Sequence, residues 1–284
     1  KKIDEQYTEN KDDIKAYEDQ DILLPMLALD YHKRGHDIHF PCMVQPKLNG
    51  VRCIYQGGKF ISRKGKEFTT LKHLIPELKE LGLKTPDGEI YIHGMSFQGI
   101  VRLLKKYRPG ETEKLEYWIY DQINDETFLE RGIEISNKFK KVNPKNLVRV
   151  PTIIVTSEEG IKEWHDKWIK EGYEGAIIRN REGLYKVKHR SKDLQKYKEF
   201  VDAEFEIVGA HEGSGPDAGT VVFEVKNKKG QVFSVRPKGT REERTEWLDN
   251  IKEIIGKDLT VRYQNLSEDG IPIFPVGIAI RDYE

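Results

Sequence analysis

Residues 42–62 read CMVQPKLNGVRCIYQGGKFIS, and this stretch holds three short apolar runs separated by two glycine turns. Asn49-Gly50 stands between the first and second runs, and Gly57-Gly58 stands between the second and third. Both dipeptides are typical of tight hairpin turns between antiparallel strands. The pattern predicts a sheet in which Lys47 lies at the end of a strand, directly before a turn.

The spacing of apolar residues changes along the rest of the chain. Helical spacing predicts helices over Leu71–Leu81, Phe97–Lys106, Thr127–Lys141 and Glu158–Glu171. Beyond Phe200 we expect three strands (Ala203–Ala210, Gly219–Val225, Gln231–Val235), a helix (Thr240–Ile255) and two strands (Asp258–Tyr263, Phe274–Ile280). That order is typical of a five-stranded OB barrel. The fold class is therefore α+β, with a mixed α/β domain over residues 22–200 and a small β-barrel OB-fold domain over residues 201–284.

Charge is distributed unevenly along the 284 residues, although the formal net charge is zero. Residues 1–21 carry −4 and residues 202–284 carry −5, so residues 22–201 carry +9. We expect the charged segment 1–21 to be helical or disordered, and the basic middle region to meet phosphates. The sequence shows no run of about 18 apolar residues and no signal peptide, which predicts a soluble, intracellular protein.

Cysteine and histidine spacing gives no sign of a metal or disulfide framework. Cys42 and Cys53 lack Cys-x-x-Cys spacing, and we expect both to be small buried strand residues. His165 and the other histidines likewise show no spacing typical of metal ligands, so surface or core positions are expected.

Lys47-Leu48-Asn49-Gly50-Val51-Arg52 is the first of seven short motifs that follow one another along the chain. Alone, the hexapeptide most often describes an ordinary lysine before a turn. The other six motifs are Ser62–Gly65 (SRKG), Asp87–Tyr91 (DGEIY), Tyr117–Asp121 (YWIYD), Glu174–Arg179 (EGAIIR), Tyr185–Arg190 (YKVKHR) and Phe274–Asp282 (FPVGIAIRD). The most specific is Lys186-Val187-Lys188, because Lys-x-Lys on a strand would place both ammonium groups on one face. Two such cations repel unless an anion lies between them.

The ordered set resembles the ATP-dependent DNA ligases of the nucleotidyltransferase family, in the minimal two-domain form found in phages and viruses. The resemblance implies that Lys47 is the catalytic nucleophile that becomes lysyl-AMP. A protonated lysine is not nucleophilic, so Lys47 must lose its proton, and nearby positive charge favours that loss. Asn49 departs from the family, where most DNA ligases carry Asp.

Further roles are implied by the same resemblance. ATP or AMP binding falls to Gln45, Arg52, Glu89, Tyr120, Arg179, Lys186, Lys188 and Arg281. Within that set, the ring of Tyr120 would stack on adenine, and Arg281 would orient pyrophosphate. Glu89 and Glu174 would hold Mg²⁺, while Arg63, Arg190 and Lys192 would contact DNA.

The implied function is the sealing of 5′-phosphate/3′-hydroxyl nicks in duplex DNA, with ATP and Mg²⁺ as cofactors. Nicked double-stranded DNA is the expected partner, no membrane is involved, and the chain is expected to be a monomer in the cytoplasm, that of the host if it is phage-encoded. RNA ligases and GTP-dependent mRNA capping guanylyltransferases share the lysine chemistry and stay open as alternatives. An OB-fold nucleic-acid-binding protein without enzymatic activity is a further alternative, which the Lys-x-Lys and Asp-Gly-Glu motifs disfavour. An NAD-dependent ligase is disfavoured because only about forty residues precede Lys47, too few for the extra domain of that group.

Overall fold

The structure is a computed structural model that describes residues 22–267 and 269–281. It divides into two compact units, the first ending at Tyr197 and the second beginning at Lys198. The boundary expected from the sequence, near Phe200, lies within a few residues of this division. The charged segment 1–21 lies outside the described residues. Among those described, no helix is long and apolar enough to cross a membrane.

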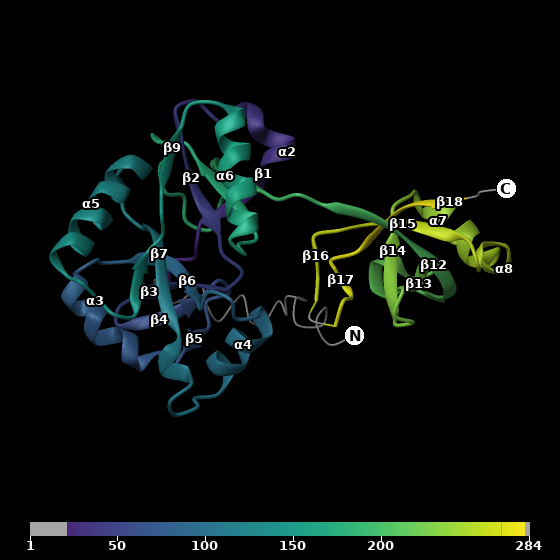
Figure 1. Ribbon diagram of the computed structural model, residues 1–284, viewed down its shortest axis with the longest axis horizontal. Coiled ribbons are helices and arrows are strands. Elements are labelled where there is room, and N and C mark those ends of the chain that lie inside the picture. The colour runs from purple at the N-terminus through teal and green to yellow at the C-terminus, as the bar shows by residue number, and fades with distance from the viewer. Residues whose placement is uncertain (1–21, 268, 282–284) are drawn as a thin grey trace. The chain divides into compact units, whose positions relative to one another are not determined.

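A five-stranded sheet in the order β1-β11-β10-β2-β9 forms one part of the first unit (Figure 1). Its strands are β1 (Leu27–Asp30), β2 (Cys42–Lys47), β9 (Ile153–Val155), β10 (Gly175–Arg179) and β11 (Arg190–Tyr197). The short helices α2 (Tyr31–Arg34) and η2 (Gly35–Asp37) follow β1. Helix α6 (Glu158–Lys170) starts at Ser157, whose side chain accepts from the Gly160 N–H. Its buried Ile161 and Trp168 pack in one cluster with Val44 and Ile178 of the sheet.

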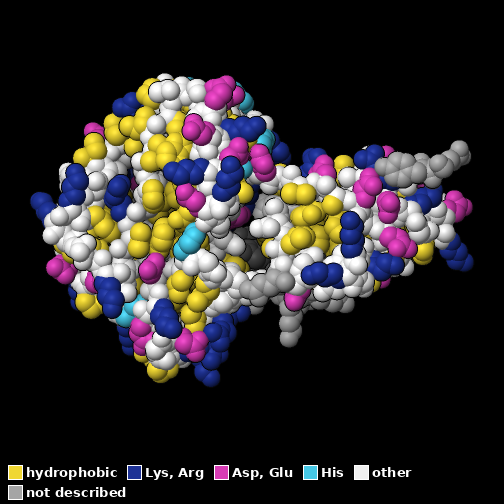
Figure 2. Space-filling model, viewed as in Figure 1, with side chains coloured by type: hydrophobic (Ala, Val, Ile, Leu, Met, Phe, Trp, Pro, Cys, Tyr) yellow, Lys and Arg dark blue, Asp and Glu magenta, His cyan; other side chains and the backbone are white. Residues whose placement is uncertain are grey.

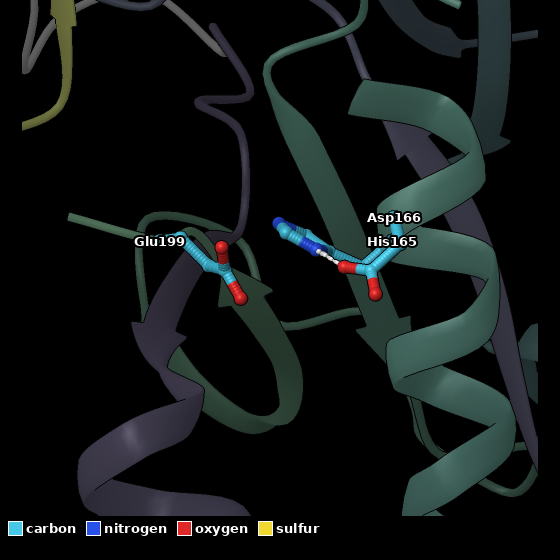
Figure 3. A group of neighbouring side chains, drawn as sticks. All are labelled: His165, Asp166 and Glu199. Carbon is cyan, nitrogen blue, oxygen red and sulfur yellow. Dashed lines mark hydrogen bonds and ion pairs between the residues drawn. The ribbon is translucent and has the colours of Figure 1, made fainter. Parts of the chain in front are cut away.

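His165 on α6 lies in the core, whereas the sequence left a surface or a core position open. The residue is 0% exposed, and its ring meets the Tyr197 ring edge-on at 4.6 Å. Its Nδ1 lies 3.0 Å from the Asp166 carboxylate (Figure 3).

A six-stranded sheet in the order β5-β4-β3-β6-β7-β8 forms the other part of the first unit. Its strands are β3 (Val51–Gln56), β4 (Lys59–Ser62), β5 (Glu67–Phe68), β6 (Pro86–Tyr91), β7 (Glu116–Gln122) and β8 (Leu147–Arg149). Gly57 and Gly58 join β3 to β4 with φ of 57° and 82°, which confirms the predicted glycine hairpin. Cys42 and Cys53 are buried strand residues, also as predicted.

The hairpin predicted at Asn49-Gly50 is wrong. Strand β2 pairs with β9 and β10, whereas β3 pairs with β4 and β6, so residues 48–50 carry the chain from one sheet to the other. Leu48 is buried in the core of the six-stranded sheet. A Cβ on Gly50 would lie 2.4 Å from the Ile90 carbonyl oxygen, so glycine is needed here for close backbone approach.

The predicted helices of the first unit are confirmed to within a few residues. They are η3 (Lys72–Leu74) with α3 (Ile75–Leu81), α4 (Phe97–Lys105), α5 (Phe128–Lys141) and α6; a short η4 (Thr112–Lys114) precedes β7. Apolar side chains of α3, α4 and α5 join those of the six-stranded sheet in one core, and Figure 1 shows these helices around that sheet. Helix α5 begins with a capping box between Thr127 and Glu130.

The second unit is a closed barrel of five strands in the order β12-β13-β14-β18-β15. The strands are β12 (Val201–Glu212), β13 (Val221–Lys226), β14 (Val232–Pro237), β15 (Asp258–Tyr263) and β18 (Val276–Arg281), with a small hairpin of β16 (Asn265–Leu266) and β17 (Pro272–Ile273). The helices η5 (Gly215–Asp217), α7 (Arg241–Asp249) and α8 (Ile251–Ile254) complete it. Three strands, a helical segment and two strands therefore confirm the predicted OB order.

Candidate active site

Lys47 and Glu174 lie side by side where two antiparallel strands of the five-stranded sheet meet. In the β2–β10 pair Lys47 is opposite Gly175, and the Glu174 N–H donates to the Lys47 carbonyl oxygen at 2.9 Å. The Lys47 ammonium donates to the Glu174 carboxylate in an ion pair. Both side chains are about one-fifth exposed, so the pair lies where a ligand can reach it.

Glu89 joins this pair from the six-stranded sheet. It lies on β6, and its carboxylate accepts from the Gly50 N–H at 2.7 Å. Burial raises the pKa of Glu89 to about 7, with Glu174 adding to the rise and with Lys47 and the Gly50 N–H opposing it. One lysine and two carboxylates, carried by both sheets, therefore act on one another at the crossing between them.

The donor set fits a hard divalent cation. Glu89 and Glu174 offer carboxylate oxygens, and Mg²⁺ in proteins is usually held by one or two carboxylates while keeping several waters. A cation held by both carboxylates would favour their ionised forms and so oppose the rise that burial produces in the pKa of Glu89.

Arg52 and Tyr120 form the next part of the site. The Arg52 guanidinium makes a two-pronged contact with the buried Asp87 carboxylate, at 3.0 Å from Nε and 2.5 Å from Nη2. It also lies 5.5 Å from the centre of the Tyr120 ring, and the Arg179 guanidinium lies 5.7 Å from that ring. The Tyr120 hydroxyl donates to the Gly88 carbonyl at 3.3 Å. The ring is held in place by its neighbours and is partly exposed.

Beneath Tyr120 lies a buried network of ionic groups. The Asp121 carboxylate accepts from Arg131 at 2.6 and 3.1 Å and from Arg179 at 2.7 Å, and all three side chains are at most 3% exposed. Arg179 Nε donates to the Gln45 side-chain oxygen at 3.0 Å, and Gln45 Nε2 donates to the Tyr120 carbonyl at 3.1 Å. The network thus fixes the strand that carries Tyr120.

Arg179, which the sequence predicts to bind ATP or AMP, has its guanidinium paired with protein groups. The residue is 2% exposed, and burial lowers its pKa below the usual arginine value. Its guanidinium is directed at Asp121 and Gln45, because a buried charge is stable only when paired. The structure therefore favours a supporting role for Arg179, and Gln45, also 2% exposed, shares it.

Lys186 and Lys188 do not lie on a strand, so that prediction is wrong. Residues 187 and 188 form a turn, and β11 begins only at Arg190. Lys188 has a φ of 58°, a left-handed conformation unusual for a residue with a side chain. The alternation of Lys, Val and Lys is typical of a strand, but backbone contacts from Leu24 and Leu27 hold this segment as a turn. Both lysines are exposed.

The predicted DNA-contacting residues lie on exposed parts of the first unit. Arg63 is in the turn after β4, which is closed by a Gly65 N–H to Ser62 carbonyl bond of 2.9 Å. Arg190 and Lys192 lie on β11, and Arg190 Nη1 donates to the Ala28 carbonyl at 3.1 Å. In Figure 2 the Lys and Arg side chains of this unit occupy several separate places on the face shown, interspersed with acidic ones.

Arg281 lies at the end of β18 in the barrel. Its Nε donates to the Thr260 hydroxyl at 2.7 Å and lies 3.3 Å from the Glu204 carboxylate. The Arg281 side chain is about two-fifths exposed.

Comparison with known proteins adds independent evidence. A family model described as ATP dependent DNA ligase domain matches residues 25–198, and another described as DNA ligase OB-like domain matches residues 212–281. The chain belongs to the ATP-dependent DNA ligase family. Its fold is accordingly an adenylation domain followed by an OB-fold domain.

Relatives within the family include viral DNA ligases and one of Haemophilus influenzae, 22% identical over 234 residues, which cover 82% of this chain and 84% of that protein. A DNA ligase of African swine fever virus is 32% identical over 269 residues, which cover 84% of this chain and 63% of that protein. The chain thus spans less than two-thirds of that relative. Among solved structures, a Lig E DNA ligase has a TM-score of 0.79 at 20% identity, covering 92% of this chain and 100% of the other. The Chlorella virus DNA ligase-adenylate has a TM-score of 0.56 at 26% identity, covering 93% and 99%.

Two residues of this ligase fold were missed in the sequence. Arg131 occupies an inward position of α5, three residues after Phe128 and four before Ile135, where helical spacing calls for an apolar residue. A charged residue at this inward position was the one feature of the sequence that could have indicated a buried ion pair. Tyr185 lies directly before the first lysine of its motif, and nothing in the sequence distinguishes it from other half-buried tyrosines.

Proposed function

We propose that this chain closes nicks in duplex DNA with ATP, through a covalent lysyl-AMP intermediate. The observation that carries the proposal is the meeting of Lys47 with Glu89 and Glu174 in a domain of this family. A lysine that interacts with two carboxylates, in a domain that also carries the partly exposed Tyr120 ring, combines a nucleophile, a cation site and a base-stacking surface.

The first step is the attack of Lys47 on ATP. Lys47 leaves its ion pair with Glu174 and gives up a proton to solvent, and its Nζ then bonds to the α-phosphorus. The bond from that phosphorus to the bridging oxygen breaks, and pyrophosphate leaves. Lys186 and Lys188 neutralise the α-phosphate, while Tyr120 stacks on the adenine.

Metal binding falls to Glu89 and Glu174. Mg²⁺ held there would supply positive charge beside the phosphates, which favours both deprotonation of Lys47 and departure of pyrophosphate. Arg281 of the OB-fold domain would orient the pyrophosphate. Gln45, Arg52 and Arg179 complete the nucleotide site, Arg179 by supporting Gln45 and Tyr120.

Two transfers to DNA follow. An oxygen of the nick's 5′-phosphate attacks the AMP phosphorus, the phosphorus–nitrogen bond to Lys47 breaks, and the amine regains a proton. The 3′-hydroxyl then attacks the 5′-phosphate, gives up its proton to solvent, and displaces AMP. Arg63, Arg190 and Lys192 would hold backbone phosphates, so binding should weaken with salt and show no sequence preference. We expect a monomer that acts in the cytoplasm, that of the host if phage-encoded.

The decisive experiment is magnesium-dependent joining of a labelled 5′-phosphate nick in duplex DNA, with ATP or GTP in separate reactions. Joining with ATP alone is the expected result, and Lys47→Ala should abolish self-labelling by ATP. A parallel nick with RNA strands tests the alternative of RNA joining. Joining of RNA alone, or lysine labelling by GTP alone, would move the function to RNA ligation or capping.

A further inference from the structure

The turn that carries Lys186 and Lys188 is held by contacts from distant parts of the chain. The Lys188 N–H donates to the Leu24 carbonyl at 3.1 Å, and the Leu27 N–H donates to the His189 carbonyl at 2.8 Å. Within the turn, the His189 N–H reaches the Lys186 carbonyl at 3.3 Å. Because Lys188 has a φ of 58°, the turn needs such contacts to keep its shape.

Tyr185 ties this turn to the six-stranded sheet. Its hydroxyl donates to Asp87 Oδ2 at 2.6 Å and accepts from the Met26 N–H at 3.2 Å. Its ring lies 5.6 Å from the guanidinium carbon of the buried Arg131. The residue before Lys186 therefore has its ring and its hydroxyl both fixed.

The acceptor in this contact is shared with Arg52. Asp87 is 0% exposed, and Oδ2 accepts from both the Tyr185 hydroxyl and Arg52 Nη2, while Oδ1 accepts from Arg52 Nε. One rigid carboxylate on β6 thus sets the positions of Arg52 and of the turn. Glu89, two residues further along the same strand, belongs to the Lys47 site.

We propose that Tyr185 is a positioning residue that holds Lys186 and Lys188 where they meet the phosphates of the nucleotide. The inference rests on the proposed function, because that function assigns the two lysines to ATP. Two ammonium groups on one short turn repel each other, and a loosely held turn would let them separate. A turn fixed through Asp87 holds both lysines in position before the nucleotide binds. Less conformational entropy is then lost when their ammonium groups meet the phosphates.

The test is Tyr185→Phe, which removes one hydroxyl and keeps the ring. Titrations use the full chain with α,β-methylene-ATP, which cannot transfer AMP, and with adenosine, which has no phosphate. We expect about tenfold weaker binding of the triphosphate, the size of one hydrogen bond to a charged group, and unchanged binding of adenosine. Tyr107→Phe is the matched control, because the Tyr107 hydroxyl donates to the Glu113 carboxylate on the surface, remote in sequence from the motifs.

Each outcome decides the matter. Equal affinity of wild type and Tyr185→Phe for the triphosphate would overturn the proposal, and so would an equal loss for both ligands, which indicates a general structural role. If Tyr185→Phe melts at a lower temperature, both affinities are measured below its melting transition. The ratio of its affinity for α,β-methylene-ATP to its affinity for adenosine then decides in the same way. Failure of the wild type itself to bind the triphosphate would instead count against the proposed function.

Discussion

Lys47 and Glu174, 127 residues apart in sequence, form an ion pair at adjoining strand ends of one sheet. The lysine is thereby held as an ammonium donor, and a donor of this kind cannot attack phosphorus. Anything that occupies the Glu174 carboxylate with positive charge competes with Lys47 for it. Release of the lysine and binding of a cation are therefore linked at one carboxylate.

Glu174→Gln should raise the magnesium concentration that self-adenylation requires. A neutral amide cannot ion-pair with Lys47 and is a poorer ligand for Mg²⁺, so we expect a rate about 100-fold lower at low magnesium. The measurement is lysine labelling by radioactive ATP across a magnesium titration. Glu171→Gln, an exposed change three residues earlier, is the control, and equal curves for both variants would contradict the linkage.

Gly50→Ala should damage the crossing between the two sheets. The new Cβ would lie 2.4 Å from the Ile90 carbonyl oxygen and 2.9 Å from Glu89 Cγ, so backbone must shift. We expect a loss of about 2 kcal/mol in the free energy of unfolding, measured in urea, with slower adenylation. Gly132→Ala in α5 has no atom within 4 Å of the added Cβ and should be neutral or slightly stabilising. Similar losses for both variants would refute the steric account.

The ionisation of Glu89 gives a pH dependence with a definite sign. Its folded pKa is raised to about 7, so between its ordinary value and pH 7 the unfolded chain releases this proton while the folded chain keeps it. Stability should therefore fall as pH rises through this window and level off above it. Glu89→Gln should remove that part of the slope, as measured by urea unfolding at several pH values. An unchanged slope would assign the pH dependence to other groups.

Arg131→Met should be among the more destabilising single changes in the first domain. The variant removes one of two arginines from the buried Asp121 carboxylate, and breaking a buried ion pair costs about 3 kcal/mol or more. Arg102→Met removes an exposed pair with Glu111 and should cost less than about 1 kcal/mol. Urea unfolding compares the two, and a cost for Arg131→Met no larger than the control would mean that the network is not stabilising.

Arg281→Ala should separate the steps of the reaction. If Arg281 orients pyrophosphate, its loss should slow self-adenylation about 100-fold and leave sealing of a pre-adenylated nick near the wild-type rate. Arg262→Ala breaks an exposed ion pair with Asp202 in the same barrel and should affect neither step. Equal loss of both steps in Arg281→Ala would contradict the assignment.

Much of the fold was predictable because its signals are local. Apolar spacing located the helices α3 to α6, and the strand order of the barrel followed from short alternating runs. The separation of β2 and β3 into different sheets was not predictable, since Asn49-Gly50 favours a hairpin as strongly as a crossing. What decides between them is distant: Leu48 finds a buried place in one core, and Gly50 fits against the Ile90 carbonyl.

In the candidate site, too, the sequence predicted what depends on local residues and missed what depends on distant contacts. The motifs predicted Lys47, Glu89 and Glu174, which the structure brings together. They misassigned the backbone of Lys186 and Lys188, because carbonyl and amide groups of Leu24 and Leu27, about 160 residues away, hold the turn. The buried arginines were hidden for a similar reason, since a charge is recognised as structural only when its partner is seen.

The backbone of Lys188 lowers the stability of the fold, while its side chain is proposed to bind phosphate. Its left-handed backbone costs a residue with a side chain about 1 kcal/mol, a cost that glycine avoids. A programme that selects variants of this protein for heat resistance alone would thus be drawn to glycine at position 188, and would discard an amine proposed to bind phosphate. Thermal screens of this protein would need a nucleotide-binding filter at that position, because there the more stable variant would lack the proposed phosphate-binding amine.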